Sequence, residues 1–81
     1  MKAKIYIKYK EGILDPQGSV TGKALNSIGI EGIQSMGIGK YIEISFKKNI
    51  TKEKAMKITE NSCNKLLVNP NTETYSYTID K

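Results

Sequence analysis

The stretch from Gly37 to Lys47 constrains the fold most, because it holds the clearest strand pattern and lies near the middle of the chain. Ile42, Ile44 and Phe46 alternate there with polar residues and a tyrosine. A period of two places three large apolar side chains on one face of a strand and polar groups on the other. The stretch therefore predicts a half-buried strand of an antiparallel sheet.

Two further stretches alternate in the same way, one near each end of the chain. Between residues 2 and 10, small, aliphatic or aromatic residues alternate with lysine or tyrosine. In residues 73–79, Tyr75, Tyr77 and Ile79 alternate with threonine and serine. Both patterns predict strands.

A first helix is predicted to begin at Asp15, which suits an N-cap and is followed by Pro16. Gly29 is a suitable residue to end it. Gly18 and Gly22 lie inside the helix, where glycine indicates either a close backbone contact or simple tolerance. The face expected to meet the core is Val20, Thr21, Ala24, Leu25 and Ile28.

A second helix is predicted between Thr51, a candidate N-cap, and Asn69-Pro70. Met56 and Cys63 lie in its apolar stripe, so we expect both in the core. The stripe is Ala55, Met56, Thr59, Ser62, Cys63, Leu66 and Leu67.

The segment between the helices permits two interpretations. A strand at Gly32 to Met36 followed by a turn at Gly37-Ile38-Gly39 makes a hairpin, which we prefer. The alternative is one long strand bent at the glycines. The predicted order is β-α-β-β-α-β, an α+β fold in which both helices cover one face of an antiparallel sheet in the ferredoxin-like manner. We expect one domain, residues 1–81.

The composition limits the chemistry available to the chain. It has no histidine, so the commonest general base and metal ligand is missing. Cys63 is the only cysteine, which rules out an internal disulfide and favours a reducing compartment. With no long apolar run and no signal peptide pattern, we expect a soluble cytoplasmic protein.

The predicted topology is shared by two classes of binding protein. An RNA-binding module fits the predicted topology and the net charge of +5. Its usual motif has glycine after the lysine, whereas Gly39 precedes Lys40, and Glu43 adds negative charge to the same face. A sensor that binds a small molecule at a dimer interface shares the topology without a specific motif. Gly37-Ile38-Gly39 lacks the third glycine of a dinucleotide loop.

Three blocks in the chain carry a resemblance to a known family. They are Leu14-Asp15-Pro16-Gln17-Gly18, Ile38-Gly39-Lys40-Tyr41 followed by Glu43, and Lys65-Leu66-Leu67 with Asn69, Glu73 and Tyr75. In this order and spacing they resemble PurS, the small subunit of phosphoribosylformylglycinamidine synthase, over nearly the whole chain. Gly22 departs from the family pattern, which has a bulkier residue there.

The resemblance implies a complex that converts formylglycinamide ribonucleotide, glutamine and ATP into formylglycinamidine ribonucleotide. It implies that this chain is not catalytic, and that ATP and Mg are used by the synthetase subunit. The implied partners are the synthetase subunit, the glutaminase subunit and the chain itself, as a dimer or a dimer of dimers, with no nucleic acid and no membrane. The implied partner interface is Asp15, Pro16, Gln17, Gly18, Gly39, Lys40 and Tyr41. A capped helix start and a tight turn are the competing structural explanations for these residues.

Overall fold

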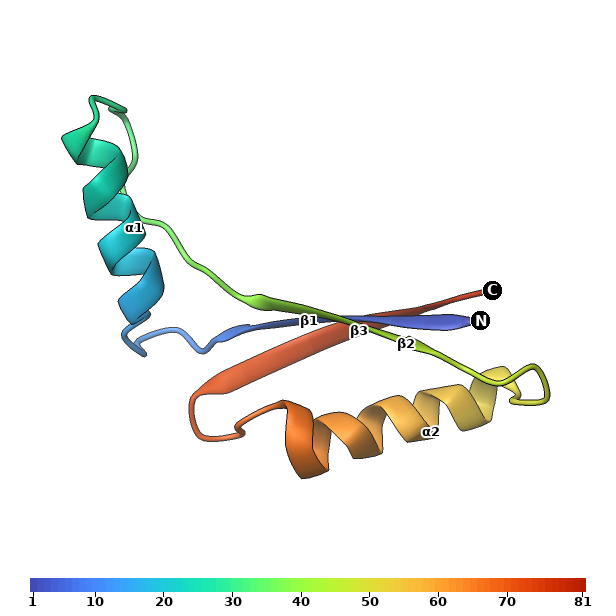
Figure 1. Cartoon of the computed structure of the whole chain (residues 1–81). Coiled ribbons are helices and arrows are strands. Elements are labelled where there is room, and N and C mark those ends of the chain that lie inside the picture. Colours follow the sequence, from blue (N-terminus) through green and yellow to red (C-terminus); the bar gives the residue numbers. More distant parts are fainter.

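The computed structural model describes residues 1–81 and contains one antiparallel sheet with two helices (Figure 1). The strands are β1 (Lys2–Tyr9), β2 (Lys40–Ser45) and β3 (Glu73–Asp80). Their order in the sheet is β2-β1-β3, so that the N-terminal strand is central. The helices are α1 (Pro16–Ser27) and α2 (Lys52–Ser62). The predicted α+β class and antiparallel sheet are confirmed.

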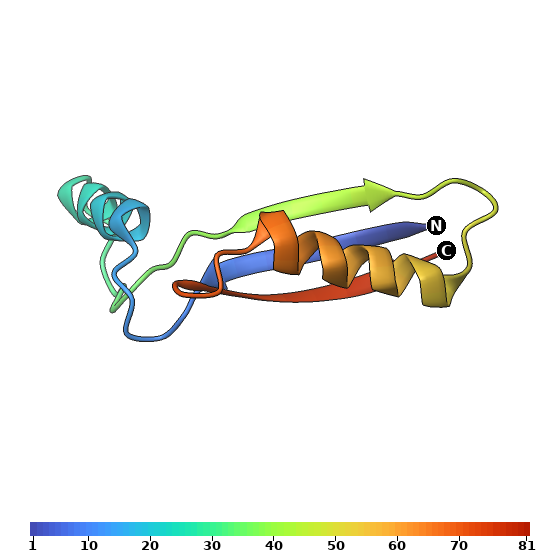
Figure 2. The same cartoon turned by 90° about the horizontal axis from the view of Figure 1, so that it is seen from below.

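The core lies between α2 and the face of the sheet that the alternation predicted. Ile5 of β1 pairs with Ile42 of β2 on one side and with Tyr77 of β3 on the other. Ile5, Ile7 and Cys63 are buried together in one cluster. Helix α2 runs along one face of the sheet (Figure 2). The partly buried residues around them are Ile42, Ile44, Leu67, Tyr75 and Tyr77.

The predicted helix boundaries are confirmed by their hydrogen bonds. Asp15 caps α1 with Pro16 at the first helical position, and Gly29 follows the helix with a φ of +91°. The Thr51 hydroxyl accepts a hydrogen bond from the Lys54 amide at 3.2 Å and so caps α2. These signals act between near neighbours in sequence, which explains why the sequence located them.

The end of α2 widens into a π-helical turn, Cys63–Leu67. The Val68 amide donates to the Cys63 carbonyl at 3.1 Å, five residues back. This turn keeps Cys63 buried but leaves Leu66 84% exposed. The prediction that Cys63 lies in the core is confirmed, and the same prediction for Met56, which is 39% exposed, is wrong. Only one side of α2 packs against the sheet, and Met56 lies on a side of the helix that the sheet does not cover.

Helix α1 stands away from the sheet, beyond one end of it (Figures 1 and 2). The expectation that both helices cover one face is therefore met by α2 only. Gly18 is the only buried residue of α1, whereas Val20 and Ile28, expected in the core, are 68% and 73% exposed. The Cα radius of gyration is 16.3 Å, against about 12 Å for a compact chain of this length.

The preferred hairpin does not form. Residues 32–36 make no strand, and the chain runs extended from α1 in line with β2 (Figure 1). This resembles the alternative of one long bent strand, except that strand pairing begins only at Lys40. Lys40 pairs with Ile7, and β1 ends at Tyr9. Residues 32–36, which precede Lys40, therefore have no strand beside them to pair with. We call residues 13–39 the arm.

None of the helices combines the length and the apolar character needed to cross a lipid bilayer.

Candidate functional site

The arm joins the sheet at a junction built around the Asp15 carboxylate. One carboxylate oxygen accepts a hydrogen bond from the Gly18 amide at 2.8 Å, and the other accepts from the Ile38 amide at 2.7 Å. The Ile38 amide, and then the Gly18 amide, lower the pKa of Asp15 below its ordinary value of 3.8. Asp15 therefore caps α1 and also ties the returning chain to the start of that helix.

Two glycines allow the segments at this junction to cross closely. A Cβ atom on Gly18 would lie 2.6 Å from the Met36 carbonyl oxygen, and one on Gly39 would lie 2.3 Å from the Ile7 carbonyl oxygen. Both neighbours are backbone atoms, which cannot move aside as a flexible side chain can. A Cβ on Gly22 would meet nothing within 4 Å. Close approach thus explains Gly18, while Gly22 faces open space.

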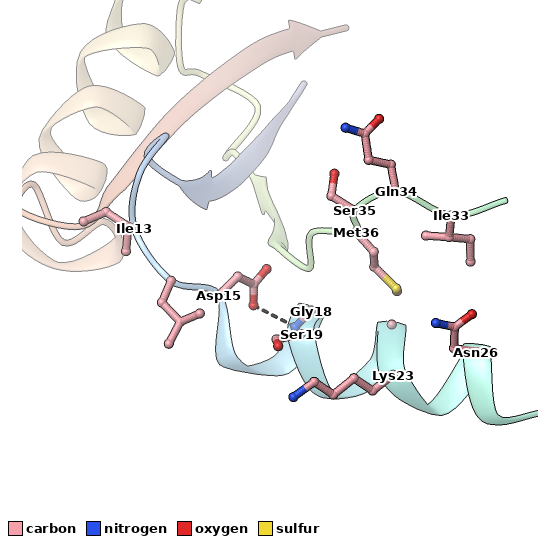
Figure 3. A pocket seen from close by; sticks show the side chains of 12 residues that line it. Ile13, Asp15, Gly18, Ser19, Lys23, Asn26, Ile33, Gln34, Ser35 and Met36 are labelled. Atoms are coloured by element: carbon pink, nitrogen blue, oxygen red, sulfur yellow. Dashed lines mark hydrogen bonds between the residues drawn. The ribbon is translucent and has the colours of Figure 1, made fainter. Parts of the chain in front are cut away.

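A cleft of about 470 Å³ lies between α1 and the returning segment (Figure 3). Met36 points from that segment toward the helix, while Gln34 points away. Asp15 and Lys23 are the only charged residues that line the cleft, and both oxygens of Asp15 already accept backbone hydrogen bonds. The geometry is suited to holding the arm in one orientation.

The start of β2 carries a polar network on the sheet face opposite α2. The Tyr41 hydroxyl donates to Glu43 at 2.6 Å, and the Tyr41 ring lies 5.1 Å from that of Tyr6. The hydrogen bond to Glu43 raises the pKa of Tyr41 to about 12. The same bond, followed by the charge of Lys2, lowers the pKa of Glu43. On the α2-facing side of the same strand, Lys40 lies 3.6 Å from the Glu73 carboxylate.

The structure brings only part of the sequence-predicted interface together. Asp15 and Gly18 are hydrogen-bonded at the arm junction, and Gly39 crosses the Ile7 backbone. The exposed side chain of Gln17 lines a small pocket together with Gly39 and Lys40. Pro16 and Tyr41 are exposed, on the first turn of α1 and at the start of β2. Contact of these residues with a partner stays a prediction.

Sequence reasoning missed the Ile38 amide, which bonds to a carboxylate 23 residues away and gives no local signal. It also missed how much apolar surface the arm exposes. Eleven large hydrophobic side chains are exposed in the whole chain, and six of them belong to the arm. The six are Ile13, Leu14, Val20, Ile28, Ile30 and Ile33. Val20 and Ile28 follow the helical period, so their pattern predicted burial without saying against what.

Comparison with known proteins identifies the family of this fold. The family model for PurS, described as phosphoribosylformylglycinamidine (FGAM) synthase, matches residues 2–81. The chain belongs to the PurS family. Membership, which the three sequence blocks predicted, is therefore confirmed over nearly the whole length.

Individual PurS proteins agree in sequence and in structure. The chain is 38% identical over 80 residues to the phosphoribosylformylglycinamidine synthase subunit PurS of Bacillus subtilis, covering 99% of this chain and 93% of that subunit. It matches the crystal structure of Methanocaldococcus jannaschii PurS with a TM-score of 0.85 and 35% identity, covering 99% of this chain and 95% of the other. A chain in the structure of PurLQS from Thermotoga maritima matches with a TM-score of 0.77 and 29% identity, covering 95% and 93%.

Proposed function

We propose that this chain is the non-catalytic subunit of FGAM synthase that bridges the ATP-dependent synthetase subunit and the glutaminase subunit. The M. jannaschii relative is described as one of the subunits of formylglycinamide ribonucleotide amidotransferase in the purine biosynthetic pathway, and the T. maritima structure is of a PurLQS assembly. By this proposal the protein acts in the cytoplasm. ATP and Mg belong to the synthetase subunit, and this chain holds no cofactor of its own.

The observation that carries the proposal is the unpacked, apolar arm. Only 8 of the 81 residues are buried, and six large aliphatic side chains of the arm face solvent instead of joining the core. Burial of one such side chain contributes about 1.5–3 kcal/mol. An exposed apolar surface of this kind marks a protein interface. An assembling subunit therefore explains the arm better than a chain that acts alone.

We further propose that the first partner of the arm is a second copy of this chain. Helix α1 has no partner layer, while Ile42, Ile44 and Phe46 of the β2 region are only partly buried beside α2. A single copy leaves both surfaces incomplete. Two copies complete both at once when the α1 helix of each covers the β2 side of the other, in a symmetric interface.

The contribution to chemistry is positional. Glutamine hydrolysis releases ammonia at one active site, and the ammonia must reach a second site without loss to water. A subunit that fixes the two sites relative to each other raises the effective concentration of the nucleophile at the second site.

Reconstitution tests the bridging role. Synthetase and glutaminase subunits are assayed with and without the chain, using either glutamine or free ammonia as the nitrogen source. We expect the glutamine-dependent rate to require the chain and the ammonia-dependent rate of the synthetase to persist without it. Glutamine-dependent turnover that is unchanged by adding the chain contradicts the proposal, as does turnover by the chain alone.

A further inference from the structure

The net charge of the chain is concentrated in one short segment. Residues 47–57 contain five lysines and one glutamate, which account for four of the five net positive charges of the protein. We call this segment the lysine end. Its lysines are Lys47, Lys48, Lys52, Lys54 and Lys57, and all five are exposed.

The lysine end lies at the opposite end of the molecule from the arm. It comprises the loop after β2 and the first turns of α2, beside both chain termini (Figures 1 and 2). The Phe46 amide donates to the Met1 carbonyl at 3.1 Å, which keeps the N-terminus next to the lysine end. The arm and the lysine end are therefore separate surfaces of the molecule.

Nothing within the chain neutralises these lysines. The three ion pairs of the structure use Lys2, Lys4 and Lys40, none of which belongs to the lysine end. Lys52 and Lys54 occupy the first turn of α2, where the helix dipole disfavours cations and Glu53 is the only acidic residue. Lys54 and Lys57 are three residues apart on one helix face, so they repel each other. Glu53 lies four residues before Lys57 and offsets part of this repulsion. One carboxylate among five lysines still leaves the segment strongly cationic, which suits an anionic partner.

We propose that the lysine end docks onto an acidic surface of another subunit of the synthase, a proposal that rests on the bridging function. A groove of about 450 Å³ passes Lys54 and Lys57, with the polar groups of Thr51 and Asn61 beside them. Acidic side chains entering this groove meet two ammonium groups and further hydrogen-bond donors. The flexible lysine stems favour charge-steered docking over fixed bidentate recognition.

A protein partner fits the lysine end better than RNA does. Recognition of single-stranded RNA uses aromatic side chains or arginine, on which the bases stack. All 13 basic residues of the chain are lysine, and residues 47–57 contain no aromatic residue. Tyr6 and Tyr41, whose rings pack against each other, lie on the sheet face away from α2.

Paired charge reversals test the proposal. The variant Lys54→Glu/Lys57→Glu alters the lysine end, and Lys8→Glu/Lys65→Glu is the control with the same change in net charge at exposed lysines elsewhere. Both variants are first checked for unchanged thermal unfolding. Binding to the purified synthetase and glutaminase subunits is then measured at low and at high salt.

At low salt we expect the lysine-end variant to bind at least one subunit about 10-fold or more weakly, and the control to differ by less than about 3-fold. The difference should shrink at high salt, because screening weakens exposed charge pairs. Equal effects of the two variants, or no effect of either, would overturn the proposal. So would loss of binding to a single-stranded RNA probe with subunit binding intact. If the unmodified chain binds neither subunit, the bridging function itself fails.

Discussion

At the scale of single residues, the arm depends on one carboxylate. Asp15 accepts hydrogen bonds from amides of its own helix and of a segment 23 residues further along. A capping residue that also bonds to a distant strand extension fixes the direction in which the helix leaves the sheet. The junction therefore explains why aspartate, with two acceptor oxygens, suits position 15 better than other capping residues.

Replacing Asp15 by serine should separate its two roles. A serine hydroxyl accepts from the Gly18 amide and keeps the cap, but it has no second oxygen for the Ile38 amide. In Asp15→Ser we expect faster hydrogen exchange at Ile38 with Gly18 still protected, and in Asp15→Ala faster exchange at both. Unchanged protection of Ile38 in the serine variant would contradict the structure of the junction.

Acid should loosen the same junction. Because the folded-state pKa of Asp15 is lowered, its contribution to stability is fully present above the ordinary value of 3.8 and is lost as the pH falls through the lower folded value. We expect the Ile38 and Gly18 amide resonances to titrate together, with a midpoint below 3.8. In Asp15→Asn this shared titration should disappear, and its persistence would assign the effect to another carboxyl group.

Two glycine substitutions should change stability in opposite directions. Gly39→Ala places a Cβ against the Ile7 carbonyl oxygen, and overpacking of this kind costs about 1–3 kcal/mol. Gly22→Ala meets open space in a helix interior, where alanine stabilises by about 0.5–1 kcal/mol relative to glycine. Denaturant midpoints measure both. Equal destabilisation by the two substitutions would show that steric contact is not what distinguishes these positions.

At the scale of elements, the two helices differ in what covers them. Ala55 and Thr59 of α2 and Cys63 of the π turn that follows are small residues buried against the sheet, and the Tyr77 hydroxyl donates to Glu60 at the edge of this contact. Helix α1 has a comparable stripe but only Gly18 is buried. A helix this short is marginal in isolation, so its stability must come from the junction and from a partner surface.

Polar substitutions on α1 should affect assembly and leave the folding of a single copy nearly unchanged. Val20→Ser/Ile28→Ser removes apolar surface that is already exposed in one copy. We expect weaker self-association by sedimentation, with the unfolding of the dilute chain little altered. The comparison is Ile5→Ala in the core, where loss of a fully buried side chain costs about 2–5 kcal/mol. Unchanged association of the double variant would remove α1 from the interface between copies.

At the scale of the whole molecule, the chain is long and thin. Its principal extents are 51 × 26 × 14 Å, with the arm at one end and the lysine end at the other. This shape separates an apolar surface from a cationic one. In a bridging subunit of this shape, the arm and the lysine end can contact different partners.

Stability should then depend on protein concentration. An association that buries the arm stabilises the folded state by mass action, so the thermal midpoint should rise as the chain is concentrated. Thermal unfolding at several concentrations measures this, and Val20→Ser/Ile28→Ser should flatten the dependence. A midpoint that is the same at all concentrations would contradict self-association through the arm.

The sequence by itself determined the helix starts, three of the predicted strands and the family. Asp15, Pro16 and Thr51 located the helix starts, and the alternation of Ile42, Ile44 and Phe46 located β2 and its core-facing side. These signals depend on hydrogen bonds within one turn and on the period of a single strand, so near neighbours are enough to fix them.

Only the tertiary structure decided where α1 lies, that no hairpin forms before β2, and that Met56 and Leu66 face solvent. The first two depend on residues far apart in the chain, namely Ile38 bonding to Asp15 and Gly39 crossing Ile7. Leu66 faces solvent because of a local π turn, which helical periodicity does not predict. An apolar stripe shows that a helix needs a partner surface. It does not show whether that surface belongs to the same chain, because the side-chain pattern is the same in both cases.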